Sequence, residues 1–207
     1  MKLVDMTVAD YLDLLKSNAP APGGGSVSAL SAAQGIGLVL MVTDLTIGKE
    51  KYAEYEDDCK KAKAEAERVL EQLTAGIDED TEAFNKVSAA YKLPKDTEEQ
   101  KAARTAAIRE ANMGATEVPF KTMQICLEGI KIAGSIVGKS NPNASSDLGV
   151  AALNLLTGLK GAWLNVKINL PGIKDYEARA EFETGAVIVE EAEALAEAIY
   201  KEVLASL

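Results

Sequence analysis

The sequence predicts an all-α protein, an up-and-down helical bundle of about six helices with a buried central helix. Apolar residues recur at steps of three, four or seven, and no alternating strand pattern of useful length occurs. Alanine is frequent while aromatic residues make up only 5% of the chain, which favours small side chains packed helix against helix. With 207 residues and no linker or repeat, we expect a single domain over residues 1–207.

The N-terminal third contains two expected helices. Thr7 and Asp10 form a capping pair for a first helix that ends before Pro20. A glycine-rich turn then leads into a second helix beginning at Ser26. The apolar run 27–47 is long enough to span a membrane, but polar residues interrupt it and no cationic segment precedes it. We therefore interpret it as the fully buried central helix and expect no membrane insertion.

The remaining elements are also helical. A charged, amphipathic helix ends before Pro94, and Thr97 begins another long helix that runs to about Gly138. Pro119 lies inside that helix and predicts a kink or break, because proline lacks the N–H that the helix needs. A proline-free helix follows within 142–171, and a last amphipathic helix completes the chain.

The charge and residue counts exclude several function classes. There are 22 Lys and Arg against 32 Asp and Glu, and no histidine, so the net charge is -10. Catalysis by Ser-His-Asp or Cys-His groups is excluded, and Cys59 and Cys126 alone cannot build a zinc site. The acidic balance argues against a nucleic-acid partner. Two distant cysteines and the lack of a secretory leader predict a cytoplasmic protein.

The first candidate site is the turn Pro22-Gly-Gly-Gly-Ser26 before the central helix. Unpaired N–H groups at a helix N-terminus can hold an anion, which makes a ligand-binding role possible for Gly23, Gly24, Gly25 and Ser26. The spacing fits neither a P-loop nor a dinucleotide fingerprint. The alternative is a tight turn capped by Ser26.

The second candidate is Asp80, which occupies a missing step in an apolar stripe that includes Ile77 and Phe84. The stripe predicts that this carboxylate projects toward the core, where it needs partners, a cavity or water. The alternative is that Asp80 stays solvated among the neighbouring acids.

The third candidate is a polar, small face that carries Asp147, Asn165 and Asn169. Asp147 and Asn165 are eighteen residues apart and so lie on the same side of a helix. Gly158 and Gly161 on this face predict a close approach. Alternatively, Asp147 only supports a serine cap and the glycines admit a neighbouring helix.

Six blocks of sequence resemble the formiminotransferase-cyclodeaminase carboxy-terminal family. That family contains formiminotetrahydrofolate cyclodeaminases and stand-alone methenyltetrahydrofolate cyclohydrolases. The blocks are PAPGGGSVSAL (20–30), LTIGKEKY (45–52), DEDTEAF (78–84), LPKDTEEQKAAR (93–104), NASSDLGVAA (143–152) and LNVKINL (164–170). One departure is Ser140, where members often have glycine before the asparagine.

The resemblance implies an all-helical, dimeric folate enzyme without metal or redox cofactor. It also implies motif positions at Gly23 to Ser26, Lys49, Asp80, Asn141, Asp147, Asn165 and Asn169. We expect Asp147, Asp80 and Lys49 to serve proton transfer and charge stabilisation, and the asparagines to orient water or the pterin. Lys49, Lys51 and Lys139 are candidates to hold the anionic glutamate tail of a folate, including a polyglutamylated one.

The reaction we favour is the cyclohydrolase reaction, in which 5,10-methenyltetrahydrofolate and water give 10-formyltetrahydrofolate. The alternative at the same site is the cyclodeaminase reaction, which converts 5-formiminotetrahydrofolate to the methenyl form and ammonia. The lack of a fused transferase region favours the cyclohydrolase. Outside this class, the alternatives are a non-catalytic helical oligomer and a phosphate-ligand binding protein.

A homodimer is the expected assembly. The small-residue faces Ala29-Ala33-Gly37 and Gly158-Gly161 would let helices of two chains approach closely across a two-fold axis. Such a dimer could place Asp147 near residues of the second subunit.

Overall fold

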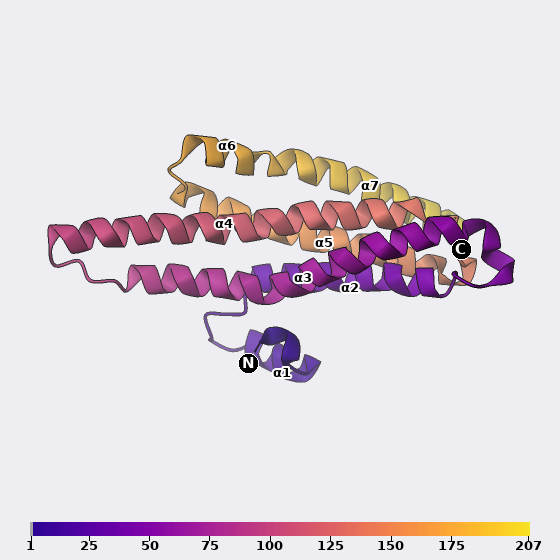
Figure 1. The fold of residues 1–207 in the computed structure, drawn as a ribbon, viewed down its shortest axis with the longest axis horizontal. Coiled ribbons are helices and arrows are strands. Elements are labelled where there is room, and N and C mark those ends of the chain that lie inside the picture. Colours follow the sequence, from indigo (N-terminus) through magenta and orange to yellow (C-terminus); the bar gives the residue numbers. More distant parts are fainter. Residues whose placement is uncertain (1) are drawn as a thin grey trace.

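A computed structural model describes residues 2–207 and confirms the all-α prediction, with no strand in that part of the chain. Four long helices form an up-and-down bundle (Figure 1). Each packs against the next in the chain, and the last closes the ring on the first. They are α2 (Gly24–Asp44), α3 (Glu56–Tyr91), α4 (Glu98–Ser135) and α5 (Ser145–Asn169).

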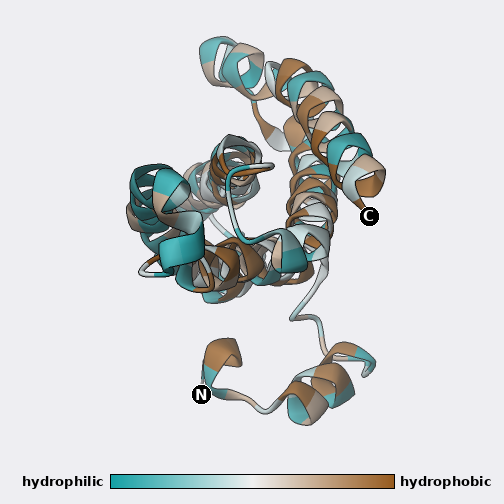
Figure 2. Ribbon diagram, turned by 90° about the vertical axis from the view of Figure 1, so that its right-hand side faces the viewer, coloured by the Kyte–Doolittle hydropathy of each residue, from teal (hydrophilic) through white to brown (hydrophobic). Residues whose placement is uncertain are grey.

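Shorter or outer helices surround this ring. α7 (Gly185–Ser206) packs against α5 and α4, and the short α6 (Tyr176–Glu183) precedes it. α1 (Val8–Leu15) begins at the predicted Thr7 cap. It lies apart from the ring in an N-terminal arm rich in hydrophobic residues (Figure 2). Four 3-10 turns complete the elements, Leu3–Asp5, Glu50–Tyr55, Pro142–Ala144 and Leu170–Gly172.

The central helix α2 begins at Gly24, two residues before the predicted start. Its side chains Ile36, Val39 and Val42 are fully buried in the core. The helix is long and apolar enough to cross a membrane, yet 56% of its most apolar window is buried inside the protein. The prediction of a fully buried helix was wrong on one side, because Val27 and Met41 are exposed on the outer face.

The glycines of α5 serve contacts within the chain. A Cβ on Gly158 would lie 2.6 Å from the Ser28 carbonyl oxygen, and one on Gly161 would overlap the Ser28 hydroxyl. On α2, Ala29 packs against Gly76 of α3. The small residues on which the dimer prediction rested are therefore largely used inside one subunit, since they let α2 approach α3 and α5 closely.

α3 and α4 extend past α2 and α5 as a helical hairpin (Figure 1). Phe84 is 42% exposed, although the periodicity placed it on a core-facing stripe, and Tyr91 farther along α3 is 54% exposed. The stripe continues along α3, but α2 begins near Ile77, so this part of α3 has no bundle core to face.

Pro119 does not break α4, which runs unbroken from Glu98 to Ser135 after a Thr97–Gln100 capping box. A proline cannot donate to the carbonyl four residues earlier, here that of Ala115. The side-chain amide of Asn169 donates to this oxygen at 2.8 Å. A residue of α5 therefore replaces the hydrogen bond that Pro119 removes.

Candidate functional site

The glycine turn places the start of α2 against Asp80 of α3. The backbone N–H of Ser26 donates to Asp80 Oδ2 at 3.0 Å, and the Ser26 hydroxyl donates to the Ile77 carbonyl at 2.7 Å. Asp80 thus projects inward, as the missing step in the stripe predicted. Burial raises the pKa of Asp80, and the hydrogen bonds from Ser26 oppose that shift.

Two glycines of the turn make room for polar side chains. A Cβ on Gly25 would overlap the Asp80 carboxylate, and a Cβ on Gly24 would lie 3.4 Å from Asn165 Nδ2. Gly23 has no such neighbour within 4 Å. The turn therefore brings an aspartate from α3 and an asparagine from α5 to the N-terminus of α2.

The two asparagines at the end of α5 use only part of their hydrogen-bonding capacity. Asn165 Nδ2 donates to the Gly161 carbonyl at 2.9 Å, and Asn169 Nδ2 donates to the Ala115 carbonyl at 2.8 Å. Neither Oδ1 has a hydrogen bond within residues 2–207. Each amide is held in place and keeps one acceptor for a ligand or water.

Tyr11 is a residue near this site that sequence analysis did not single out. It is the one buried residue of α1, and its hydroxyl has no hydrogen-bond partner in the described part of the chain. Burial raises the pKa of Tyr11, and the charge of Asp80 raises it further. The sequence alone could not single out Tyr11, because it belongs to the apolar pattern of α1 and nothing in that pattern indicates a role for its hydroxyl.

The other predicted residues lie at the opposite end of the bundle. Lys49, Lys51 and Lys139 are exposed there, and Lys139 forms an ion pair with Asp58 at 3.1 Å. Lys51 Nζ lies 5.3 Å from the centre of the Tyr52 ring.

Asn141 at this end connects two loops. Its Oδ1 accepts hydrogen bonds from the Tyr52 hydroxyl at 2.9 Å and from the Asn143 N–H at 3.0 Å. Its own N–H donates to Thr46 Oγ1 at 3.0 Å. These contacts give Asn141 a structural role in the chain, in addition to the substrate contact expected from the sequence.

Asp147 lies in the first turn of α5, half-buried and without a side-chain hydrogen bond or ion pair within residues 2–207. It shares a face with Asn165, as predicted, but eighteen residues of helix place the two about 27 Å apart. The predicted residues therefore do not form one site within a single chain.

The predicted site residues form two groups, one at each end of the bundle. The glycine end contains Gly23, Gly24, Gly25, Ser26, Asp80, Asn165 and Asn169, and the lysine end contains Lys49, Lys51, Lys139, Asn141 and Asp147.

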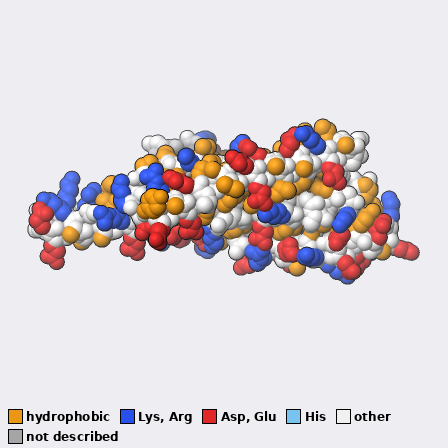
Figure 3. All heavy atoms as spheres, turned by 90° about the horizontal axis from the view of Figure 1, so that it is seen from above, with side chains coloured by type: hydrophobic (Ala, Val, Ile, Leu, Met, Phe, Trp, Pro, Cys, Tyr) orange, Lys and Arg blue, Asp and Glu red, His pale blue; other side chains and the backbone are white. Residues whose placement is uncertain are grey.

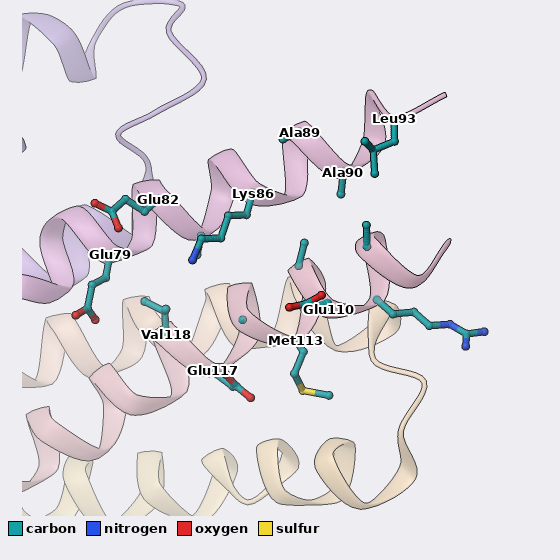
Figure 4. Close-up of a pocket in the computed structure, with 15 residues that line it drawn as sticks. Glu79, Glu82, Lys86, Ala89, Ala90, Leu93, Glu110, Met113, Glu117 and Val118 are labelled. Carbon is teal, nitrogen blue, oxygen red and sulfur yellow. The ribbon is translucent and has the colours of Figure 1, made fainter. Parts of the chain in front are cut away.

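Beside the glycine end, a groove of about 1010 Å³ runs between α3 and α4 along the projecting hairpin (Figure 4). It begins at Glu79 of α3, the residue before Asp80, and at Val118 of α4. Its floor is made of alanines, Gly114 and a few larger apolar residues. Its charged residues are Glu79, Glu82, Lys86, Arg109, Glu110 and Glu117. Within residues 2–207, no three acidic or cysteine side chains converge to hold a metal ion.

The fold and these two groups define a helical-bundle protein whose polar site residues are carboxylates, amides and lysines. The family model for formiminotransferase-cyclodeaminase matches residues 7–187, and the chain belongs to that family.

The relatives of this chain include proteins named for each of the two reactions. The chain is 45% identical to a methenyltetrahydrofolate cyclohydrolase of Methylorubrum extorquens, over 95% of each chain. It is 34% identical to the formimidoyltransferase-cyclodeaminase of Rattus norvegicus, over 84% of this chain but only 32% of that protein. A solved formiminotetrahydrofolate cyclodeaminase from Thermotoga maritima matches with a TM-score of 0.81 and 26% identity, over 98% of this chain and 96% of that one.

Proposed function

We propose that this protein is a methenyltetrahydrofolate cyclohydrolase. The observation that carries the proposal is the 45% identity with a protein of that name along 95% of both chains. By contrast, the chain spans about a third of the length of the formimidoyltransferase-cyclodeaminases it matches.

The chemistry suits the side chains at the site. The carbon between N5 and N10 of the methenyl form is a cationic amidinium, and water adds to it. The bond from that carbon to N5 then breaks, one water proton ends on N5, the other is released, and the formyl group stays on N10. Carboxylates stabilise the cation and accept the proton from water, while asparagine amides orient the water. Asp80 and Asp147 are our candidates for the acid–base steps.

The proposal needs no metal or redox cofactor, because the step is a hydrolysis that requires only water and proton transfer. We also propose a cytoplasmic location. The two cysteines support it, because Cys59 and Cys126 are free and buried. The substrate's glutamate tail, including a polyglutamylated one, requires nearby cations.

We further propose that the working enzyme is a homodimer that brings together the glycine end of one chain and the lysine end of the other. A suitable surface lies on the outside of α2 and α5, on either side of the contact between Ser31 and the Asn154 carbonyl. Its exposed apolar residues are Val27, Met41, Leu45, Val150, Leu153, Leu164 and Ile168.

A two-fold axis across this outer face can pair α2 and α5 with their partners in the antiparallel sense. The partner's Asp147 and Lys49 would then lie beside Asp80 and Asn165. Within one chain, the helix holds Asn165 about 27 Å from Asp147. Light scattering at micromolar concentration tests the assembly. A fully active monomer of about 22 kDa would refute it.

The second candidate is the cyclodeaminase reaction, which the structural similarity to the Thermotoga maritima enzyme favours. Two assays on one preparation separate the candidates. One follows the loss of methenyl absorbance, and the other follows ammonia release from 5-formiminotetrahydrofolate. We expect methenyl hydrolysis to dominate, and ammonia release much faster than hydrolysis would overturn the assignment.

The two alternatives outside folate enzymes are a phosphate-ligand binding protein and a non-catalytic helical oligomer, and they differ in what they bind. A phosphate cradle at the glycine turn is disfavoured, because the Ser26 N–H already donates to Asp80, whose negative charge would repel a phosphate. A thermal-shift screen with folates and nucleotides separates the classes. We expect stabilisation by folates alone. A response to nucleotides would support the phosphate-binding class, and no ligand response together with no turnover would support a non-catalytic oligomer.

A further inference from the structure

The groove between α3 and α4 is long and open at its outer end. Its lining runs along α3 from Glu79 to Ala90, eleven residues or about 17 Å of helix, with Leu93 just beyond the helix end. Its volume of about 1010 Å³ is at the upper end of the range typical for small-molecule sites. The groove therefore has room for an elongated ligand whose inner end lies by Glu79, the residue before Asp80.

Charge is distributed unevenly along this groove. At the inner end, Glu79, Glu82 and Glu117 line it, and none of them forms an ion pair within residues 2–207 (Figure 4). Farther out, the charged residues of the lining are Lys86, Arg109 and Glu110. The adjoining segment 92–109, most of which lies outside the lining, has five Lys and Arg against three Asp and Glu, although the whole chain carries -10. Figure 3 shows Lys and Arg side chains, with some acids among them, at the narrow end of the molecule. The inner end thus suits a cation and the outer end suits an anion.

The floor of the groove is narrow and built from small residues. Alanines from both helices and Gly114 line it, with Met113 and Val118 beside them. A Cβ placed on Gly114 would meet no atom within 4 Å, so this glycine borders open space and relieves no contact in the free protein. A flat ring system can lie against such a floor without displacing side chains.

We propose that this groove binds the folate substrate in one orientation. The pterin and its methenyl cation lie at the inner end near Glu79, Glu82 and Glu117, and the glutamate tail points along Lys86 and Arg109 toward the hairpin tip. This inference rests on the proposed function. It replaces the lysine end as the main anchor for the tail with cations of the same chain.

A steric test uses Gly114. Gly114→Leu fills the groove, so we expect the dissociation constant for the methenyl substrate to rise at least about tenfold. The melting temperature should not fall, because leucine favours a helix more than glycine does. Ala198→Leu, on the exposed face of α7 and outside the groove, is the matched control, for which we expect wild-type binding and stability. A Gly114→Leu protein that binds and turns over substrate normally would overturn the proposal.

A charge test uses the two ends of the groove. Lys86→Gln with Arg109→Gln should lower the preference for a triglutamylated over a monoglutamylated substrate by at least about fivefold. Glu82→Gln with Glu117→Gln should weaken binding of the cationic methenyl form more than that of the neutral-headed 10-formyl product. Lys201→Gln on α7, outside the groove, is the control and should change neither ratio. Unchanged ratios in both double variants would overturn the orientation.

Measurements on the wild-type protein distinguish a failure of the proposed function from a failure of the groove assignment. If it neither binds nor hydrolyses methenyltetrahydrofolate, the proposed function fails. If it does both and the Gly114 and charge variants behave as wild type, only the assignment of the groove fails.

Discussion

The two ends of the bundle are built in different ways. At the glycine end, Asp80 and Asn165 are held by backbone groups, and Asp80 lies against Gly25, which leaves no space for a side chain. At the lysine end, Lys49 and Lys51 are exposed, and Asp147 has no partner within the described residues. The predicted residues of the glycine end are enclosed but include no lysine or arginine, and those of the lysine end include cations and a free carboxylate but have little enclosure.

This difference suggests that neither end is a complete site. An α-helix of the length of α2 spans about 31 Å, so the bundle itself keeps the two groups apart. Side chains cannot cover such a distance. A second chain in the antiparallel sense would supply what each end lacks, and the variants below test the contribution of each end.

The largest effect is expected at Asp147. Asp147→Asn should lower turnover at least about 100-fold, because an amide keeps the shape but neither accepts a proton nor balances a cation. Stability should hardly change, since the carboxylate makes no hydrogen bond or ion pair in the described chain. Steady-state kinetics and thermal melting measure the two effects. Normal turnover would mean that the lysine end takes no part in catalysis.

Gly25→Ala tests the crowding at the glycine end. The new methyl group would overlap the Asp80 carboxylate, so we expect a loss of about 1–3 kcal/mol in the free energy of unfolding and a clear loss of turnover. Gly37→Ala in the same helix is the control, because a Cβ there meets nothing within 4 Å and should slightly stabilise the protein. Equal behaviour of the two variants in urea unfolding would contradict the packing described here.

Asn169 and Pro119 form a testable pair. Asn169→Ala removes the donor to the Ala115 carbonyl and should cost about 1–3 kcal/mol of unfolding free energy. In a Pro119→Ala background the restored N–H can bind that carbonyl, so the same change should cost less. A double-mutant cycle by denaturant unfolding measures the coupling. Additive effects would show that Asn169 does not compensate for the proline.

Asp80→Asn should raise stability slightly, and the effect should depend on pH. The folded-state pKa of Asp80 is raised by burial, so its contribution to stability is complete below the ordinary value of 3.8 and is lost as pH rises through the folded value. The variant should therefore melt higher than wild type at pH 7, and the difference should vanish near pH 4. A lower melting temperature at pH 7 would show that the hydrogen bonds from Ser26 outweigh burial. Its turnover should fall as well.

Much of the fold could be predicted because the signals are local. Thr7 and Thr97 fixed two helix starts through side-chain caps that involve only the next three residues. Pro119 was misjudged because the group that compensates for it, Asn169, lies fifty residues away. Phe84 was misjudged because periodicity gives the face of a helix but not where the neighbouring helix ends.

The candidate site was predictable residue by residue but not as an arrangement. The gap in the apolar stripe correctly indicated that Asp80 points inward. A helical wheel places Asp147 and Asn165 on one face but ignores the rise along the axis, so it missed their separation of about 27 Å. The acids of the groove gave no signal, because Glu79 and Glu117 resemble ordinary solvated residues of long charged helices.

Mixing two inactive variants tests the central claim most directly. If each site combines Asp80 of one chain with Asp147 of the other, a dimer of Asp80→Asn and Asp147→Asn chains contains one intact site. Unfolding and refolding the two variants together at equal concentration should then restore about a quarter of wild-type activity, because half of the randomly paired dimers are mixed. Each variant refolded alone is the control. A mixture that stays as inactive as its components would contradict a site shared between the two ends.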